Sequence, residues 1–151
     1  MLGYFETPID NTNLRLQTMR SHVQIKWETP SLRINSKTLD STLDNLIKKR
    51  NLLWDKRLPE MIWAYFSDLN SILVDISRAL RKNGHIAIVV GNSAYAGITV
   101  DSSKILKEIA HTHGFQSAEC RSVRVMRTSS QQTASTKALD EWLILFSRTT
   151  A

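Results

Sequence analysis

The chain is poor in the residues that build disulfides, metal centres and membrane spans. It holds one cysteine, Cys120, and four scattered histidines among 151 residues. This composition excludes an internal disulfide and offers no convincing metal-ligand spacing. No apolar run approaches the roughly 20 residues that span a bilayer, and the first ten residues lack the basic start and apolar stretch of a secretory signal. We therefore expect a cytoplasmic protein with no metal and no membrane partner.

Basic residues outnumber acidic ones, and the excess is concentrated in two segments. The net charge is +6. Residues 1–57 carry ten Lys and Arg against six Asp and Glu, and residues 120–137 carry three arginines and one lysine with no acid. A solvated basic face is one interpretation. The concentration in two segments favours the other interpretation, a nucleic-acid partner.

The length and the 42% hydrophobic content are typical of one globular domain with a buried core. Residues 1–58 have no sustained periodicity, which predicts irregular structure and short helices, one of them within residues 39–53. From Pro59 onward the pattern becomes regular. It predicts helices over 59–80 and 102–113 and strands over 85–90, 116–126 and 141–147. Trp63, Tyr65 and Phe66 lie on the long helix and are assigned to its core face.

The stretch from His85 to Gly97, HIAIVVGNSAYAG, is an apolar strand that ends in a small polar loop. Residues 86–90 have no polar face, which is typical of a strand inside a parallel sheet. Ligands bind at the carboxyl strand ends of open α/β sheets, so the loop is a candidate site. The order of elements is that of the closing half of an α/β domain. We therefore expect one edge of the sheet to lie open.

Four stretches of this sequence resemble the S-adenosylmethionine-dependent, site-specific DNA methyltransferases that modify an exocyclic amino group of adenine or cytosine. They are Leu14-Arg15 followed by Met19-Arg20-Ser21-His22-Val23, the stretch YFSDLNSILVDISRALRKNGH from Tyr65, VVGNSAYAG followed by Val100-Asp101, and RVMRTSSQQ from Arg124. The resemblance covers residues 12–147 and is to the C-terminal portion of such an enzyme.

The resemblance implies an α/β fold, the C-terminal half of a class I methyltransferase with a Rossmann-like sheet that ends in an antiparallel strand pair. It divides the chain into a basic, partly irregular segment over residues 1–58, which would contact DNA or recognise the target, and the α/β part over residues 59–151. In the family's sheet the strands that end at Val90 and near Met126 run in the same direction. The loops that follow them are therefore expected to meet.

Two motifs of the family are absent. The family binds its cofactor with a glycine-rich loop, and it holds the flipped target base with Asp, Ser or Asn followed by Pro-Pro-Tyr or Pro-Pro-Phe. The five glycines of this chain do not cluster, and none of its three prolines is followed by another. The resemblance therefore implies no catalytic residue in this chain. It also implies that S-adenosylmethionine binds only together with a complementing methyltransferase N-terminal chain.

The resemblance assigns roles to residues on both sides of the expected sheet edge. The rim of the active site, or base pocket, would be formed by Asn92, Ser93, Tyr95, Ser129, Ser130, Gln131 and Gln132, whose side chains donate and accept hydrogen bonds. DNA would be contacted by Arg15, Arg20, His22, Arg124 and Arg127, where the arginines suit phosphates.

The first hypothesis is therefore a part or subunit of a restriction–modification type DNA methyltransferase, inactive without its complementing half. Adenine and cytosine remain open as targets, and the chain fits a split subunit or a truncated product. The alternatives are a non-catalytic nucleic-acid-binding module and an inactive methyltransferase remnant.

Overall fold

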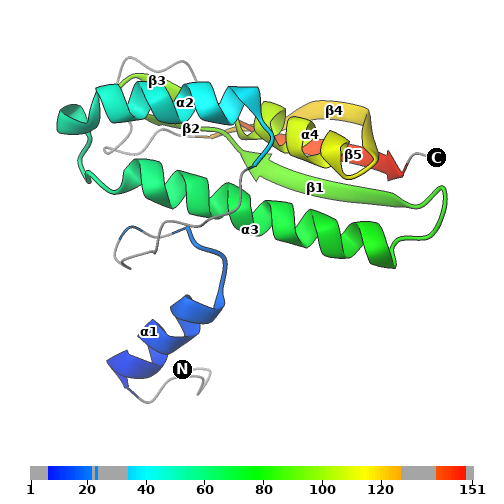
Figure 1. Ribbon diagram of the computed structural model, residues 1–151, viewed down its shortest axis with the longest axis horizontal. Helices are drawn as coiled ribbons and strands as arrows, with labels where there is room; N and C mark the ends of the chain where they lie inside the picture. Colours follow the sequence, from blue (N-terminus) through cyan, green and yellow to red (C-terminus); the bar gives the residue numbers. More distant parts are fainter. Residues whose placement is uncertain (1–6, 22, 24–33, 127–138, 149–151) are drawn as a thin grey trace.

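The computed structural model describes residues 7–21, 23, 34–126 and 139–148. Its fold is of mixed α/β type, as expected (Figure 1). The elements are α1 (Pro8–Gln17), α2 (Lys37–Lys48), the 3₁₀ turn η1 (Arg50–Leu52), α3 (Leu58–Ala79), β1 (His85–Gly91), β2 (Ser93–Tyr95), β3 (Ile98–Val100), α4 (Ser102–Thr112), β4 (Phe115–Met126) and β5 (Leu139–Arg148).

The helices begin and end where local signals place them. Pro59 lies in the first turn of the 22-residue helix α3, where its missing N–H costs nothing. The Asp101 side chain accepts a hydrogen bond from the backbone N–H of Lys104 and so caps α4. Gly114, at φ 77°, follows the end of α4. After α3 it is Asn83, at φ 60°, that takes the left-handed conformation, whereas Gly84 has no positive φ.

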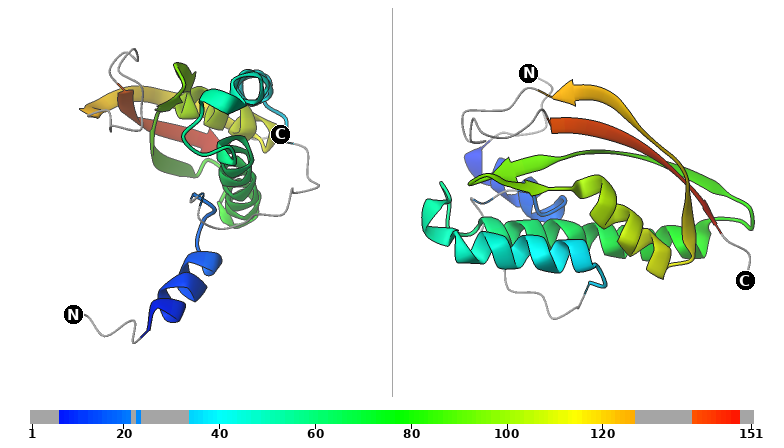
Figure 2. Two further views of the ribbon diagram at one scale, coloured as in Figure 1. Left: turned by 90° about the vertical axis from the view of Figure 1, so that its left-hand side faces the viewer. Right: turned by 90° about the horizontal axis from the view of Figure 1, so that it is seen from above.

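The core lies between a three-stranded sheet and helices α2, α3 and α4, which gather on one face of that sheet (Figure 2). Phe66 and Leu73 of α3 and Ile105 of α4 are almost completely buried, as are Ile144 and Phe146 of β5. The buried residues of α3 include Ile62, Phe66, Leu69 and Leu73, and those of α4 include Ile105 and Ile109. Their spacing of three or four positions is that of one helix face. Ile144 and Phe146, two positions apart, lie on the same face of β5 and are buried there.

The sheet has the strand order β1-β5-β4, with β5 antiparallel to both neighbours. β1 and β4 consequently run in the same direction, as expected. The prediction that residues 86–90 form an interior strand of a parallel sheet is wrong for the part of the chain that the structure describes. There β1 pairs only with β5 and forms an edge of the sheet. Its second apolar face remains exposed, with Val89 at 54%.

The polar stretch after β1 is a hairpin and not the expected loop. β2 pairs with β3 in an antiparallel register that joins Tyr95 to Ile98. The two residues between them, Ala96 and Gly97, have φ values of 48° and 76°. Positive φ at both central positions is the geometry of a type I′ turn, whose twist matches the flanking strands. The hairpin thereby fixes the direction of Ser93 and Tyr95.

Helix α1 stands away from the rest of the molecule (Figure 1) and contains no buried residue. A capping box of Thr7 and Asp10 starts it: the backbone N–H of each residue donates to the side chain of the other. Ile9 and Leu16 are 69% and 52% exposed. The chain then returns to α3 through residues 18–21.

Candidate functional site: a cavity at the carboxyl end of β1

A cavity of about 160 Å³ lies where β1 ends and the β2–β3 hairpin begins. Three segments distant in sequence contribute to it: the stretch before Val23, the first half of α3, and the chain from β1 to the start of α4. Its lining residues are Ser21, Met61, Ile62, Tyr65, Phe66, Gly91, Ser93, Tyr95, Val100 and Ser102.

The cavity wall is aromatic and neutral. Tyr65 and Phe66 meet edge to face, with ring centroids 5.1 Å apart and an angle of 77° between the planes. Burial raises the pKa of the Tyr65 phenol, so this group remains a hydroxyl donor at neutral pH. Ser21, Ser93 and Ser102 add three more hydroxyls, and none of the ten lining residues is charged. Such a wall suits a flat, uncharged ring with hydrogen-bonding edges.

The predicted residues Asn92, Ser93 and Tyr95 lie together at this end of β1, and Ser93 and Tyr95 line the cavity. Asn92 lies between β1 and β2, where its backbone N–H donates to the Asp140 carbonyl at 2.9 Å. Its side-chain Oδ1 is buried and has no hydrogen-bond partner among the described residues. Trp142, which pairs with Val90 across the sheet, likewise has a buried Nε1 without a hydrogen-bond partner among the described residues. Buried polar atoms without a partner are rare in proteins.

The strand that precedes the second predicted motif ends beside the cavity. Met126 is the last residue of β4, and its side chain lies against Gly91, because a Cβ added there would approach Met126 Cε to 2.7 Å. The two carboxyl strand ends therefore lie at the same edge of the sheet, on either side of β5. The meeting of the loops after them stays a prediction, because the loop after Met126 lies outside the described residues. The predicted rim residues Ser129, Ser130, Gln131 and Gln132 lie outside the described residues, as do the predicted DNA contacts His22 and Arg127.

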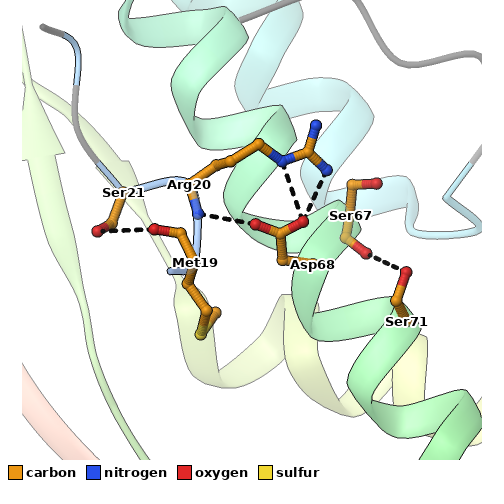
Figure 3. A network of polar contacts seen from close by, with 6 residues as sticks. All are labelled: Met19, Arg20, Ser21, Ser67, Asp68 and Ser71. Atoms are coloured by element: carbon orange, nitrogen blue, oxygen red, sulfur yellow. Dashed lines mark hydrogen bonds and ion pairs between the residues drawn. The ribbon is translucent and has the colours of Figure 1, made fainter. Parts of the chain in front are cut away.

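The remaining predicted DNA contacts are arginines in three different situations. Arg20 is held by Asp68 of α3 (Figure 3), with 2.7 Å between Arg20 Nη2 and Asp68 Oδ1 and only 24% of the arginine side chain exposed. Arg124 is 68% exposed and forms a two-fold contact with Glu141, at 2.9 and 3.3 Å. Arg15 lies in the exposed last turn of α1 and forms no ion pair with a described carboxylate.

Sequence reasoning missed several cavity residues, above all Tyr65, which the helical pattern assigns to the core. Phe66 is indeed 1% exposed, but Tyr65 is only partly buried and borders the cavity. The available signal was its position four residues after Met61, which places both residues on the border of the apolar face of α3. Ser21 and Ser102 carried no signal of their own.

The described residues contain no group of three or more His, Cys, Asp or Glu side chains that could hold a metal ion. No described helix has the length and apolarity needed to cross a bilayer. Comparison of the chain with family models, with curated proteins and with solved structures found no match.

Proposed function

We propose that this chain is the C-terminal portion of an S-adenosylmethionine-dependent DNA methyltransferase that modifies an exocyclic amine of adenine or cytosine. The carrying observation is the neutral, aromatic cavity at the carboxyl end of β1, which is bordered by residues of the motif VVGNSAYAG. In this proposal the cavity forms one wall of the pocket for the extruded target base. Ser93, Tyr95 and the Tyr65 hydroxyl face the edges of that base.

The chain's own residues do not fit the cofactor. A glycine-rich loop lets a ligand approach the backbone closely. At the glycine of β1 and the glycine of the turn before it, neighbouring atoms of this chain already fill the space beside the backbone. A Cβ at Gly84 would lie 2.5 Å from Leu80 Cγ, and one at Gly91 would meet Met126. The close packing of neighbouring side chains therefore accounts for glycine at these two positions. We assign cofactor binding and the Pro-Pro-Tyr function to a complementing methyltransferase N-terminal chain.

The exposed side of the sheet supports a complementing chain. β1 leaves one backbone edge unpaired among the described residues, and on the face away from the helices it presents Ala87 and Val89 beside Leu145 and Leu143 of β5. A second copy of this chain could pair its β1 edge with this one in an antiparallel way, related by a two-fold axis perpendicular to the sheet. The helices of both copies would then lie on the same face of the joined sheet. The apolar face would then remain uncovered. A different polypeptide with both a strand and a helix covers edge and face together.

The second candidate is a non-catalytic nucleic-acid-binding module. It is favoured by the basic excess and by the absence of both family motifs from the sequence. An inactive remnant shares these features but retains neither function. A methyl-transfer assay distinguishes the proposed enzyme from the binding module and from the remnant, because only the complemented enzyme transfers methyl groups.

The test is co-expression with the neighbouring reading frame, followed by transfer of labelled methyl groups from S-adenosylmethionine to DNA. We expect that frame to encode the glycine-rich loop and the Pro-Pro-Tyr motif, and we expect transfer only when both chains are present. Ser93→Ala should lower transfer, whereas Thr99→Ala, an exposed position of the same hairpin, should not. A neighbouring frame without these motifs, or micromolar binding of S-adenosylmethionine by the isolated chain in calorimetry, would overturn the proposal.

A further inference from the structure

The connection between α2 and α3 is strongly basic. Residues 48–57, KKRNLLWDKR, hold five basic residues and one acidic residue, a balance of +4 in a chain whose total is +6. Seven of these ten positions are exposed: Lys48, Lys49, Asn51, Leu52, Trp54, Lys56 and Arg57. We call residues 48–57 the basic connection.

Three cations of the basic connection have no carboxylate partner among the described residues. Arg50 pairs with Glu60 at 2.7 Å, and Arg57 pairs with Asp55 at 2.7 Å. Lys48, Lys49 and Lys56 are exposed and form no ion pair with a described residue. Of the three ammonium groups, that of Lys49 donates to the backbone carbonyl oxygen of Ala96. Ammonium groups on long exposed side chains are suited to phosphate contacts that release counterions.

Large apolar side chains lie exposed among these cations. Leu52 is 72% exposed and Trp54 is 47% exposed, and Ile47 at the end of α2 is 50% exposed. Leu53, between the first two, is only 7% exposed and anchors the segment in the core. An exposed tryptophan among lysines that have no carboxylate partner combines a flat face for a base with charges for the nucleic-acid backbone, as in proteins that bind nucleic acids.

The basic connection lies beside the cavity. Lys49 Nζ is 3.5 Å from the carbonyl oxygen of Ala96, in the turn of the β2–β3 hairpin. The same hairpin supplies Ser93 and Tyr95 to the cavity wall. In Figure 1 the connection and the hairpin occupy the same end of the molecule, while the turn after α3 occupies the opposite end.

We propose that the basic connection is a DNA-contact surface, in which Lys48, Lys49 and Lys56 hold phosphates and Trp54 stacks on a base next to the cavity. This inference rests on the proposed function, because it names the surface that holds the DNA beside the base pocket. An anionic membrane would also attract lysines and tryptophan. The exposed apolar residues here stand on a short turn and not on the long amphipathic face that membrane-surface helices use.

The full chain is titrated with a fluorescein-labelled DNA duplex and with the corresponding single strand, over a range of salt concentrations. Lys48→Gln/Lys49→Gln should reduce the salt slope of log affinity by about 2. Arg81→Gln/Lys82→Gln is the matched control: it removes the same charge from exposed positions at the other end of the 22-residue α3, about 33 Å away. Trp54→Ala should weaken binding about tenfold, and Trp54→Phe should restore most of the loss.

Equal slope changes in the two double variants would overturn the proposal, because the charge would then act diffusely. It would also be overturned if Trp54→Ala bound DNA like the parent chain, or if the chain bound phosphatidylcholine–phosphatidylserine vesicles through Trp54 in preference to DNA. Binding is measured without methyl transfer, so the two proposals can fail separately. If the variants lose DNA binding but the chain never supports methyl transfer, the DNA-contact surface is supported and the proposed enzyme activity is refuted.

Discussion

Asp68 holds Arg20 through both its carboxylate oxygens. The backbone N–H of Arg20 donates to Asp68 Oδ2 at 2.7 Å, while the guanidinium Nε and Nη2 donate to Oδ1 at 3.0 and 2.7 Å. Because Ser21 follows directly and borders the cavity, this contact fixes one wall of the candidate site to the middle of α3. The arginine expected to contact DNA therefore has a local structural role.

Asp68→Asn should lower the free energy of unfolding by about 1–3 kcal/mol, because the charge-assisted bonds to Arg20 become neutral ones. The comparison is Asp75→Asn on the same helix, whose 3.6 Å contact with Arg78 is three-quarters exposed. That variant should change the free energy by less than about 0.5 kcal/mol. Urea unfolding of both variants measures the difference, and equal losses would contradict the role given to Arg20.

Gly84 and Gly91 should respond unequally to alanine. At Gly84 the new Cβ would lie 2.5 Å from Leu80 Cγ and 2.8 Å from the Arg81 backbone oxygen, which cannot move freely. At Gly91 it would meet only the end of the Met126 side chain, which can rotate away. We expect Gly84→Ala to cost about 1–3 kcal/mol and Gly91→Ala less than about 1 kcal/mol. Thermal unfolding of the two variants gives the order, and a larger cost at Gly91 would count against this packing.

The parts of the fold that depend on neighbours in sequence could be predicted. The three- and four-residue spacing of apolar residues and Pro59 predicted α3, and alternation predicted β4 and β5. The β2–β3 hairpin was missed because its turn carries Ala96, where the usual signal is Asn or Gly. The edge position of β1 was missed because an apolar strand has the same pattern whether its second face is covered by this chain or is left exposed.

The candidate site was predicted in part for the same reason. Ser93 and Tyr95 follow a strand directly, so the sequence pointed to them. Tyr65 and Ser102 come to the cavity through the packing of α3 and α4 against the strand ends, which no local pattern records. The lysines of the basic connection were visible in the sequence, but a turn that places them beside the hairpin could be recognised only in the structure.

Ala96 should be a point where the hairpin can be strengthened. Its φ of 48° is unfavourable for alanine and acceptable for asparagine. Ala96→Asn creates the Asn-Gly pair that type I′ turns prefer, and we expect a gain of about 0.5–1 kcal/mol. Ala96→Val places a β-branched residue in the same conformation and should destabilise the protein by a larger amount. Shifts of the urea midpoint in opposite directions test this, and parallel shifts would argue against the turn.

His113 should make the stability of the protein sensitive to pH just below neutrality. Burial lowers the pKa of its imidazole below the usual 6.5, and Nε2 lies 2.7 Å from Asn70 Oδ1. The unfolded chain therefore takes up a proton at a higher pH than the folded protein. The resulting contribution to stability is present above pH 6.5 and is lost as the pH falls through the lowered pKa. His113→Gln should remove that part of the decline below pH 6.5, whereas His111→Gln, at an exposed position in the last turn of α4, should leave it in place. Unfolding free energies measured across this range decide the matter, and a decline in His113→Gln as steep as in the parent protein would show that another group is responsible.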